Sequence, residues 1–188
     1  PDSEIEAYVE KLYAATKGRF MGTGMGTDEK AIRRVFNEIP TLMDVALVSK
    51  YFQEDYSDAW TFDSNLYNVM INELSDSDFN KYVTRPLNPA KKPLLTLGEK
   101  TYTLDQLKQW GKDIEKAKKG AKDTLTLIDP NSLKGNFVKR IQHIMNLYAV
   151  QKELGKNIAE DGSWGPKTDE MFNTFLNHVS NNHTTFKD

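Results

Sequence analysis

The residues with the clearest capacity for chemistry lie between two amphipathic segments, in the run Gly22-Thr23-Gly24-Met25-Gly26-Thr27-Asp28-Glu29. Three glycines at every second position remove Cβ atoms, so the backbone carbonyls of a tight connection can converge. The acidic pair that follows suits the start of the next helix, where the helix dipole favours carboxylates. The pattern is compatible with a plain helix connector, a phosphate cradle or a calcium site.

A second run with chemical potential, Asp161-Gly162-Ser163-Trp164-Gly165-Pro166-Lys167-Thr168, precedes the last amphipathic segment. Asp161-Gly162 is typical of a turn, and Pro166 suits the first turn of a helix. Thr168 can supply a donor and an acceptor near that helix start. Trp164 can anchor the loop on an apolar core, so the run predicts an ordered loop.

Composition and missing motifs argue against several classes of protein. The chain has 188 residues, no cysteine and a net charge of −2, which gives no reason to expect nucleic-acid binding. Its three histidines, His143, His178 and His183, lack the spacing of a metalloprotease motif, and no Lys-Ser/Thr follows the glycine run as a P-loop requires. No apolar run approaches the roughly 20 residues of a membrane-spanning helix. We therefore expect a non-enzymatic protein.

Apolar residues at three- and four-residue spacing predict a mainly α-helical protein. The predicted helices cover residues 3–17, 31–39, 42–52, 66–74, 79–83, 104–119, 137–154 and 166–179. Thr103 and Gln106 have the spacing of a capping box at the start of the sixth helix. Pro86, Pro89 and Pro93 disfavour helix, and residues 94–103 are compatible with a small β-hairpin.

The predicted organisation is two helical bundles joined by a proline-rich linker with this hairpin. A five-helix bundle spans residues 1–84, the linker and hairpin span 85–103, and a second helical domain spans 104–188. The boundaries follow the change in composition at the three prolines.

Residues 3–84 resemble a single annexin repeat. The resemblance is carried by Gly24–Glu29, by the helix Ala31–Ile39 and by Ile71-Asn72-Glu73-Leu74. It implies a calcium site built from the carbonyls of Gly22, Gly24 and Gly26 with the carboxylate of Glu73, and an ion that bridges to phospholipid head groups. Such ligands suit calcium, which takes six to eight oxygens. The alternative is that the glycines shape a helix connection while Asp28 and Glu29 stabilise the next N-terminus.

Residues 136–179 resemble a small peptidoglycan-binding domain of the kind appended to cell-wall hydrolases. The matching features are Val138, Ile141 and Gln142, the run Asp161–Thr168, and Phe172 with Phe175 on the following helix. The resemblance implies that the residues contacting peptidoglycan include Asp161, Gly162, Trp164 and Thr168. The alternative is a stable join between two helices that has no wall ligand.

The two resemblances together suggest a non-catalytic structural or adaptor protein of an assembly that meets the bacterial envelope, such as a phage virion or a contractile-injection particle. Its expected partners are other protein subunits and peptidoglycan, with a virion, extracellular particle or bacterial envelope as its location. Trp60 and Phe62, in the polar segment 57–64, are candidate interface anchors because aromatic residues often carry binding energy. The alternatives are a calcium-dependent phospholipid-binding module and an accessory or divergent cell-wall hydrolase.

Overall fold

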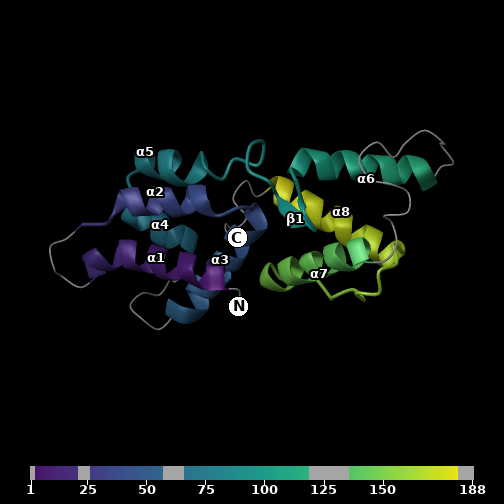
Figure 1. The fold of residues 1–188 in the computed structure, drawn as a ribbon, viewed down its shortest axis with the longest axis horizontal. Helices are drawn as coiled ribbons and strands as arrows, with labels where there is room; N and C mark the ends of the chain where they lie inside the picture. The colour runs from purple at the N-terminus through teal and green to yellow at the C-terminus, as the bar shows by residue number, and fades with distance from the viewer. Residues whose placement is uncertain (1–2, 21–25, 57–65, 119–135, 182–188) are drawn as a thin grey trace. The chain divides into compact units, whose positions relative to one another are not determined.

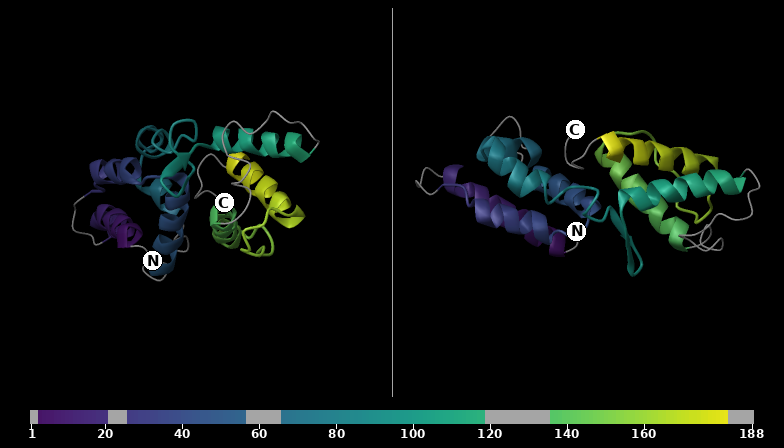
Figure 2. Two further views of the ribbon diagram at one scale, coloured as in Figure 1. Left: turned by 45° about the vertical axis from the view of Figure 1, so that its right-hand side comes forward. Right: turned by 90° about the horizontal axis from the view of Figure 1, so that it is seen from above.

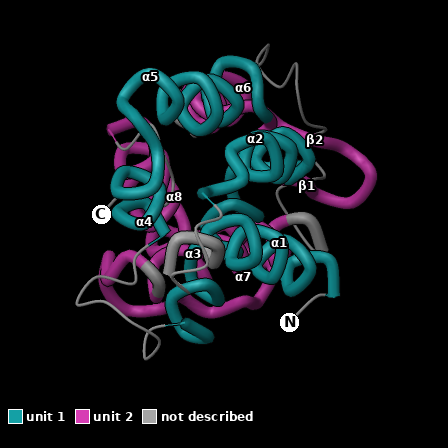
Figure 3. Tube along the Cα trace, turned by 90° about the vertical axis from the view of Figure 1, so that its left-hand side faces the viewer, with its two compact units in different colours: residues 1–92, 183–188 teal, residues 93–182 magenta. Residues whose placement is uncertain are grey.

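A computed structural model describes residues 3–20, 26–56, 66–118 and 136–181. The described chain is mainly helical, with eight α-helices and one two-stranded antiparallel hairpin, which confirms the predicted fold class. It divides into two compact units, residues 1–92 (unit 1) and 93–182 (unit 2) (Figure 3). None of the described helices is long and apolar enough to cross a membrane.

Unit 1 consists of helices that bury their apolar residues in a common core, and Figure 1 shows how these helices are arranged. Its elements are α1 (Ser3–Phe20), α2 (Glu29–Glu38), α3 (Leu42–Tyr56), α4 (Leu66–Glu73), α5 (Asp76–Phe79) and a π-helical turn (Asn80–Thr84). Helix α1 packs against both α2 and α3, α3 also contacts α4, and the π-helical turn packs against α2. The predicted fifth helix is therefore a short α-helix that continues as a π-helical turn.

The helix starts of unit 1 are set by side chains that accept hydrogen bonds from backbone amides. Asp28 is the N-cap of α2, where its Oδ1 accepts a bond from the Ala31 amide at 3.0 Å. At α3, Thr41 Oγ1 accepts from the Asp44 amide and Asp44 Oδ2 accepts from the Thr41 amide, both at 3.1 Å. Each bond satisfies an amide that lacks a partner within its helix.

The first part of the predicted linker belongs to unit 1. Leu87 is fully buried, and Lys92 is only 9% exposed. The Lys92 ammonium donates to the carbonyl of Phe36 at 3.0 Å, at the C-terminal end of α2 where the helix dipole favours a cation. Burial lowers the pKa of Lys92. The division between the units therefore lies at residues 92/93, within the segment 85–103 that the sequence suggested as a linker.

Unit 2 begins with the hairpin and continues with three long helices. Its elements are β1 (Leu95–Leu97), β2 (Lys100–Tyr102), α6 (Leu104–Lys118), α7 (Asn136–Gln151) and α8 (Pro166–Asn181). Leu95 pairs with Tyr102 across the hairpin, and Gly98 makes the turn with a φ of +67°, a conformation that glycine adopts without strain. The capping box predicted at α6 is confirmed, since the Thr103 amide donates to Gln106 Oε1 at 2.8 Å.

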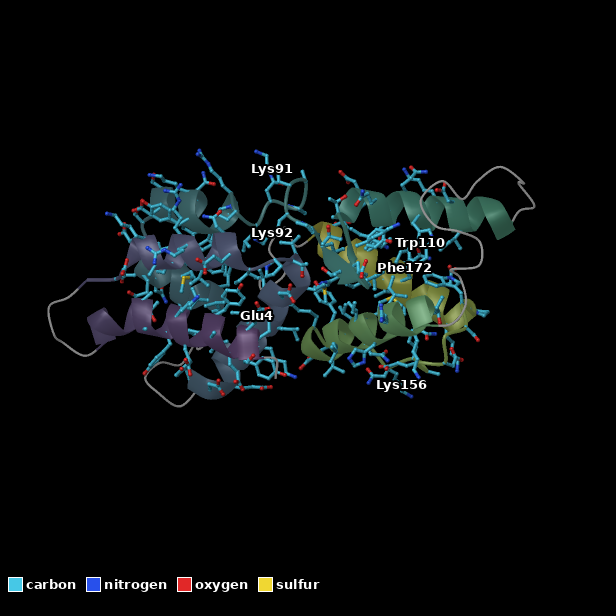
Figure 4. All side chains as sticks on the ribbon, viewed as in Figure 1. Glu4, Lys91, Lys92, Trp110, Lys156 and Phe172 are labelled. Atoms are coloured by element: carbon cyan, nitrogen blue, oxygen red, sulfur yellow. The ribbon has the colours of Figure 1, made fainter. Side chains whose placement is uncertain are left out.

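Helix α8 packs against both α6 and α7 (Figures 1 and 2). The contact between α6 and α8 centres on Trp110 and Phe172, whose rings meet edge to face with centroids 5.3 Å apart (Figure 4). A Cβ on Gly111 would lie 3.3 Å from the Phe172 ring, so a glycine at this position allows the close approach of the two helices. Strand β1 contacts α7, which places the hairpin beside that helix.

A hydrogen-bonded pair of a buried tyrosine and a half-buried histidine joins α7 to α8. The Tyr148 hydroxyl and His178 Nδ1 form a hydrogen bond of 2.8 Å, and their rings meet edge to face. Burial, assisted by the charge of Lys152, lowers the pKa of His178. Folding therefore favours the neutral imidazole.

We expect acidification to destabilise unit 2 in two separate steps. An imidazole whose folded pKa is depressed contributes stability above its unfolded pKa of 6.5, and this stability is lost as the pH falls below that value. Glu160 and Asp161 also have lowered pKa values, so their contribution is lost only below about pH 4.5. Urea unfolding measures the free energy of unfolding at pH 8 and at pH 5, and the decrease between the two should be smaller for His178→Gln than for wild type. His183→Gln is the control for removal of an imidazole. An equal decrease in wild type and in His178→Gln would contradict the role of His178 in the first step.

Candidate functional site

The loop between α7 and α8 is held by one buried amide, that of Gln142. Gln142 is fully buried on α7, and its Oε1 accepts a hydrogen bond from the Gly162 amide at 2.9 Å. Its Nε2 lies 3.0 Å from Thr168 Oγ1, 3.1 Å from Asp161 Oδ1 and 3.1 Å from the Ser163 carbonyl. These three acceptors share two hydrogens. The amide therefore fixes the loop on the helix with every one of its polar groups engaged.

A second amide holds the same loop one helical turn further along α7. Asn146 donates to the Ile158 carbonyl and accepts from the Ile158 amide, both at 2.9 Å. Its Nδ2 also donates to Glu160 Oε1 at 3.0 Å. Because residues four apart share one face of a helix, Gln142 and Asn146 fasten two successive parts of the loop. Sequence reasoning missed Asn146 and Glu160, although an asparagine within an apolar helical stripe was the available signal.

Trp164 ties the loop to the helices on its other side, as its type and position suggested. Its ring meets Trp110 and Phe172 edge to face, with centroids 5.2 and 5.1 Å apart. Its Nε1 donates to Asp169 Oδ1 at 3.1 Å. The indole is therefore packed and hydrogen-bonded within unit 2.

The structure brings together the four residues suggested for wall binding and engages all of them in contacts within unit 2. Thr168 is buried against Gln142, and Gly162 has a φ of +75°, which favours glycine. Asp161 is exposed, but its carboxylate accepts hydrogen bonds from the Ser163 amide and from Gln142. Both hydrogen bonds lower the pKa of Asp161, and the one from Ser163 contributes most. In this conformation the four residues shape the loop, and neighbouring side chains are left to meet a ligand.

Beside this loop lies a groove of about 400 Å³, which we call the loop groove. It is lined by Leu154, Gly155, Lys156, Asn157, Ile158, Lys167, Glu170, Met171 and Thr174. Two lysines, one carboxylate, one amide and one hydroxyl therefore line the groove together with the apolar side chains of Leu154, Ile158 and Met171. Such a mixture of a few polar groups over apolar side chains is typical of ligand sites.

In unit 1, the structure brings the predicted carboxylate to the end of the glycine run. Thr27 Oγ1 donates to Glu73 Oε2 at 2.5 Å across 46 residues of sequence. Helix α4 therefore carries Glu73 to this loop despite the long intervening segment. Gly26 is exposed, and a Cβ there would meet no atom within 4 Å, so steric crowding does not explain why this position is a glycine.

The remaining predicted residues are Gly22, Gly24, Trp60 and Phe62, and they lie outside the described residues. Across the ranges that the structure describes, no three histidine or carboxylate side chains gather in a way that could hold a metal ion. A calcium site at Glu73 would therefore depend on backbone carbonyls of the glycine run.

Comparison with protein-family models, with curated proteins and with solved structures found no match to this chain. The two resemblances therefore rest on the sequence motifs alone.

Replacing Gln142 by alanine should destabilise unit 2 by about 3 kcal/mol, because it leaves the buried Gly162 amide without its acceptor and opens a cavity. Urea or thermal unfolding measures this loss. Asn173→Ala, which removes an exposed amide from α8, is the matched control and should change stability by less than about 0.5 kcal/mol. Similar effects of the two substitutions would show that the Gln142 network is not a principal constraint.

Proposed function

We propose that this chain is a non-catalytic adaptor of an assembly that acts at the bacterial envelope, and that unit 2 binds peptidoglycan through the loop groove. The observation that carries this proposal is the fastening of the α7–α8 loop by Gln142 and Asn146 directly beside that groove. A loop held before binding loses little conformational entropy when a ligand arrives.

The chemistry of the loop groove suits the wall polymer. Peptidoglycan presents amides, hydroxyls and carboxylates along an extended chain. Lys156 and Lys167 can donate to carboxylates, Asn157 and Thr174 can exchange hydrogen bonds with amides and hydroxyls, and Glu170 can accept from them. The resemblance to peptidoglycan-binding domains supports the same ligand. Unit 1 would then contact other protein subunits, with Trp60 and Phe62 as the candidate anchors.

Pull-down with purified sacculi tests the wall-binding part. The double variant Lys156→Gln/Lys167→Gln should be retained about tenfold less than wild type, because it removes two charge-assisted hydrogen bonds. Lys30→Gln/Lys91→Gln changes the charge equally at two exposed lysines of unit 1 and should be retained like wild type. Failure of wild type to bind sacculi, or equal retention of both double variants, would contradict the proposal.

A second candidate function, calcium-dependent binding to phospholipid by unit 1, is favoured by the contact between Thr27 and Glu73. In that contact the carboxylate lies at Thr27, next to Gly26, which supports an annexin-like arrangement. Backbone carbonyls and one carboxylate would supply the hard oxygen ligands of the ion.

A calcium site should make the melting temperature depend on the ion, because a ligand that binds only the folded state stabilises it. Wild type should melt at a higher temperature in millimolar calcium than in chelator, by an amount equivalent to about 2.7 kcal/mol at a hundred times Kd. Glu73→Gln should abolish the difference while it keeps an acceptor for Thr27. Glu10→Gln, at an exposed glutamate of α1, is the matched control. If wild type melts at the same temperature in both buffers, the calcium site is contradicted and the glycine run is only a connector between helices.

A further inference from the structure

A second concave site lies in unit 2 between the hairpin and the exposed side of α7. It has a volume of about 550 Å³ and is lined by Thr96, Lys139, Arg140, His143, Ile144 and Glu160. We call it the hairpin pocket. It shares no lining residue with the loop groove, and its size falls within the range of small-ligand sites.

Two cations of α7, Lys139 and Arg140, line the hairpin pocket. A Cβ on Gly98 would come within 3.1 Å of Arg140 Nη1, so the guanidinium lies against the hairpin turn. Among the described residues, Arg140 forms no ion pair with a carboxylate. Its planar set of donors, which suits a carboxylate in a two-bond geometry, is therefore open to a ligand.

The hairpin pocket also contains a negative group with a defined position. Glu160 is held by Asn146 at 3.0 Å and by His143, whose Nδ1 lies 3.1 Å from both carboxylate oxygens. The hydrogen bond from Asn146 lowers the pKa of Glu160 most. The hydrogen bond and charge of His143, and then the charge of Lys139, lower this pKa further. Charges of both signs thus line the pocket at neutral pH, with the apolar side chain of Ile144 beside them.

We propose that the hairpin pocket binds the terminal carboxylate of a short peptide, with Arg140 and Lys139 on the carboxylate and Glu160 on an ammonium group of the same ligand. A phosphate is less well suited, because its second negative charge would face Glu160. Uncrosslinked stem peptides of the wall carry both a terminal carboxylate and, in many walls, a side-chain amine. The assignment to the wall rests on the proposed function, whereas the carboxylate chemistry does not.

The test is a titration of the isotope-labelled full chain, followed by amide chemical shifts. The probes are the pentapeptide L-Ala-γ-D-Glu-L-Lys-D-Ala-D-Ala, its C-terminal amide, and an all-L Ala-Glu-Lys-Ala-Ala peptide. The free acid should give saturable shifts at residues 96, 139–144 and 160 and bind about tenfold more tightly than the amide. Arg140→Gln should weaken binding of the acid about tenfold, and Arg140→Lys should restore part of it. Lys112→Gln, at an exposed lysine of α6 that lines neither cavity, should leave it unchanged.

Any of three results would overturn the proposal. The free acid and the amide could bind equally well, Arg140→Gln could bind the acid like wild type while it keeps the wild-type melting temperature, or the chemical-shift changes could centre on the loop groove. Equal binding of the all-L peptide supports the carboxylate site and assigns its ligand to protein C-termini. Binding of the pentapeptide without retention on sacculi supports the hairpin pocket and removes the wall function. Retention on sacculi with no saturable peptide binding removes the pocket and leaves the wall function intact.

Discussion

The amide of Gln142 is the interaction on which the arrangement of unit 2 most depends. It is fully buried in a helix whose neighbouring core positions are apolar, so its polar atoms have no access to water. A buried amide left without partners costs about 1–3 kcal/mol per group, and the loop that contains Asp161, Gly162 and Ser163 supplies those partners. The helix and the loop therefore satisfy each other. Asn146 repeats the arrangement one turn later, and between them the two amides determine where the loop groove and the hairpin pocket can form.

The same constraint separates the residues that shape the loop from those that can meet a ligand. Thr168 and Gly162 are buried, and Trp164 is packed on Trp110 and Phe172. In the proposed functions, recognition is assigned to other side chains, such as Lys156 of the same loop in the loop groove and Arg140 of α7 in the hairpin pocket. The residues of a motif can in this way be occupied by folding, so function has to be argued from the adjacent surface.

Much of the fold was predictable because local signals and tertiary structure agree. The apolar spacing of the helices, the capping pair Thr103–Gln106 and the hairpin within residues 94–103 all appear as expected. The π-helical turn at Asn80–Thr84 and the capture of Lys92 by α2 were not predictable, because both depend on contacts that are distant in sequence or on small shifts of hydrogen bonding. In the site, Gln142 was identified by resemblance, but the roles of Asn146 and Glu160 depend on a loop conformation that no periodic pattern encodes.

Native-state hydrogen exchange at the Gly162 amide tests the central constraint most directly, because this group donates to Gln142 Oε1 and to nothing outside the loop network. If the amide network holds the loop, the Gly162 amide exchanges only when unit 2 unfolds, as slowly as the amide of Met145 in the middle of α7. Exchange of Gly162 as fast as that of the exposed Lys156 in the same loop would show that the loop opens independently of the helix, and would contradict the account.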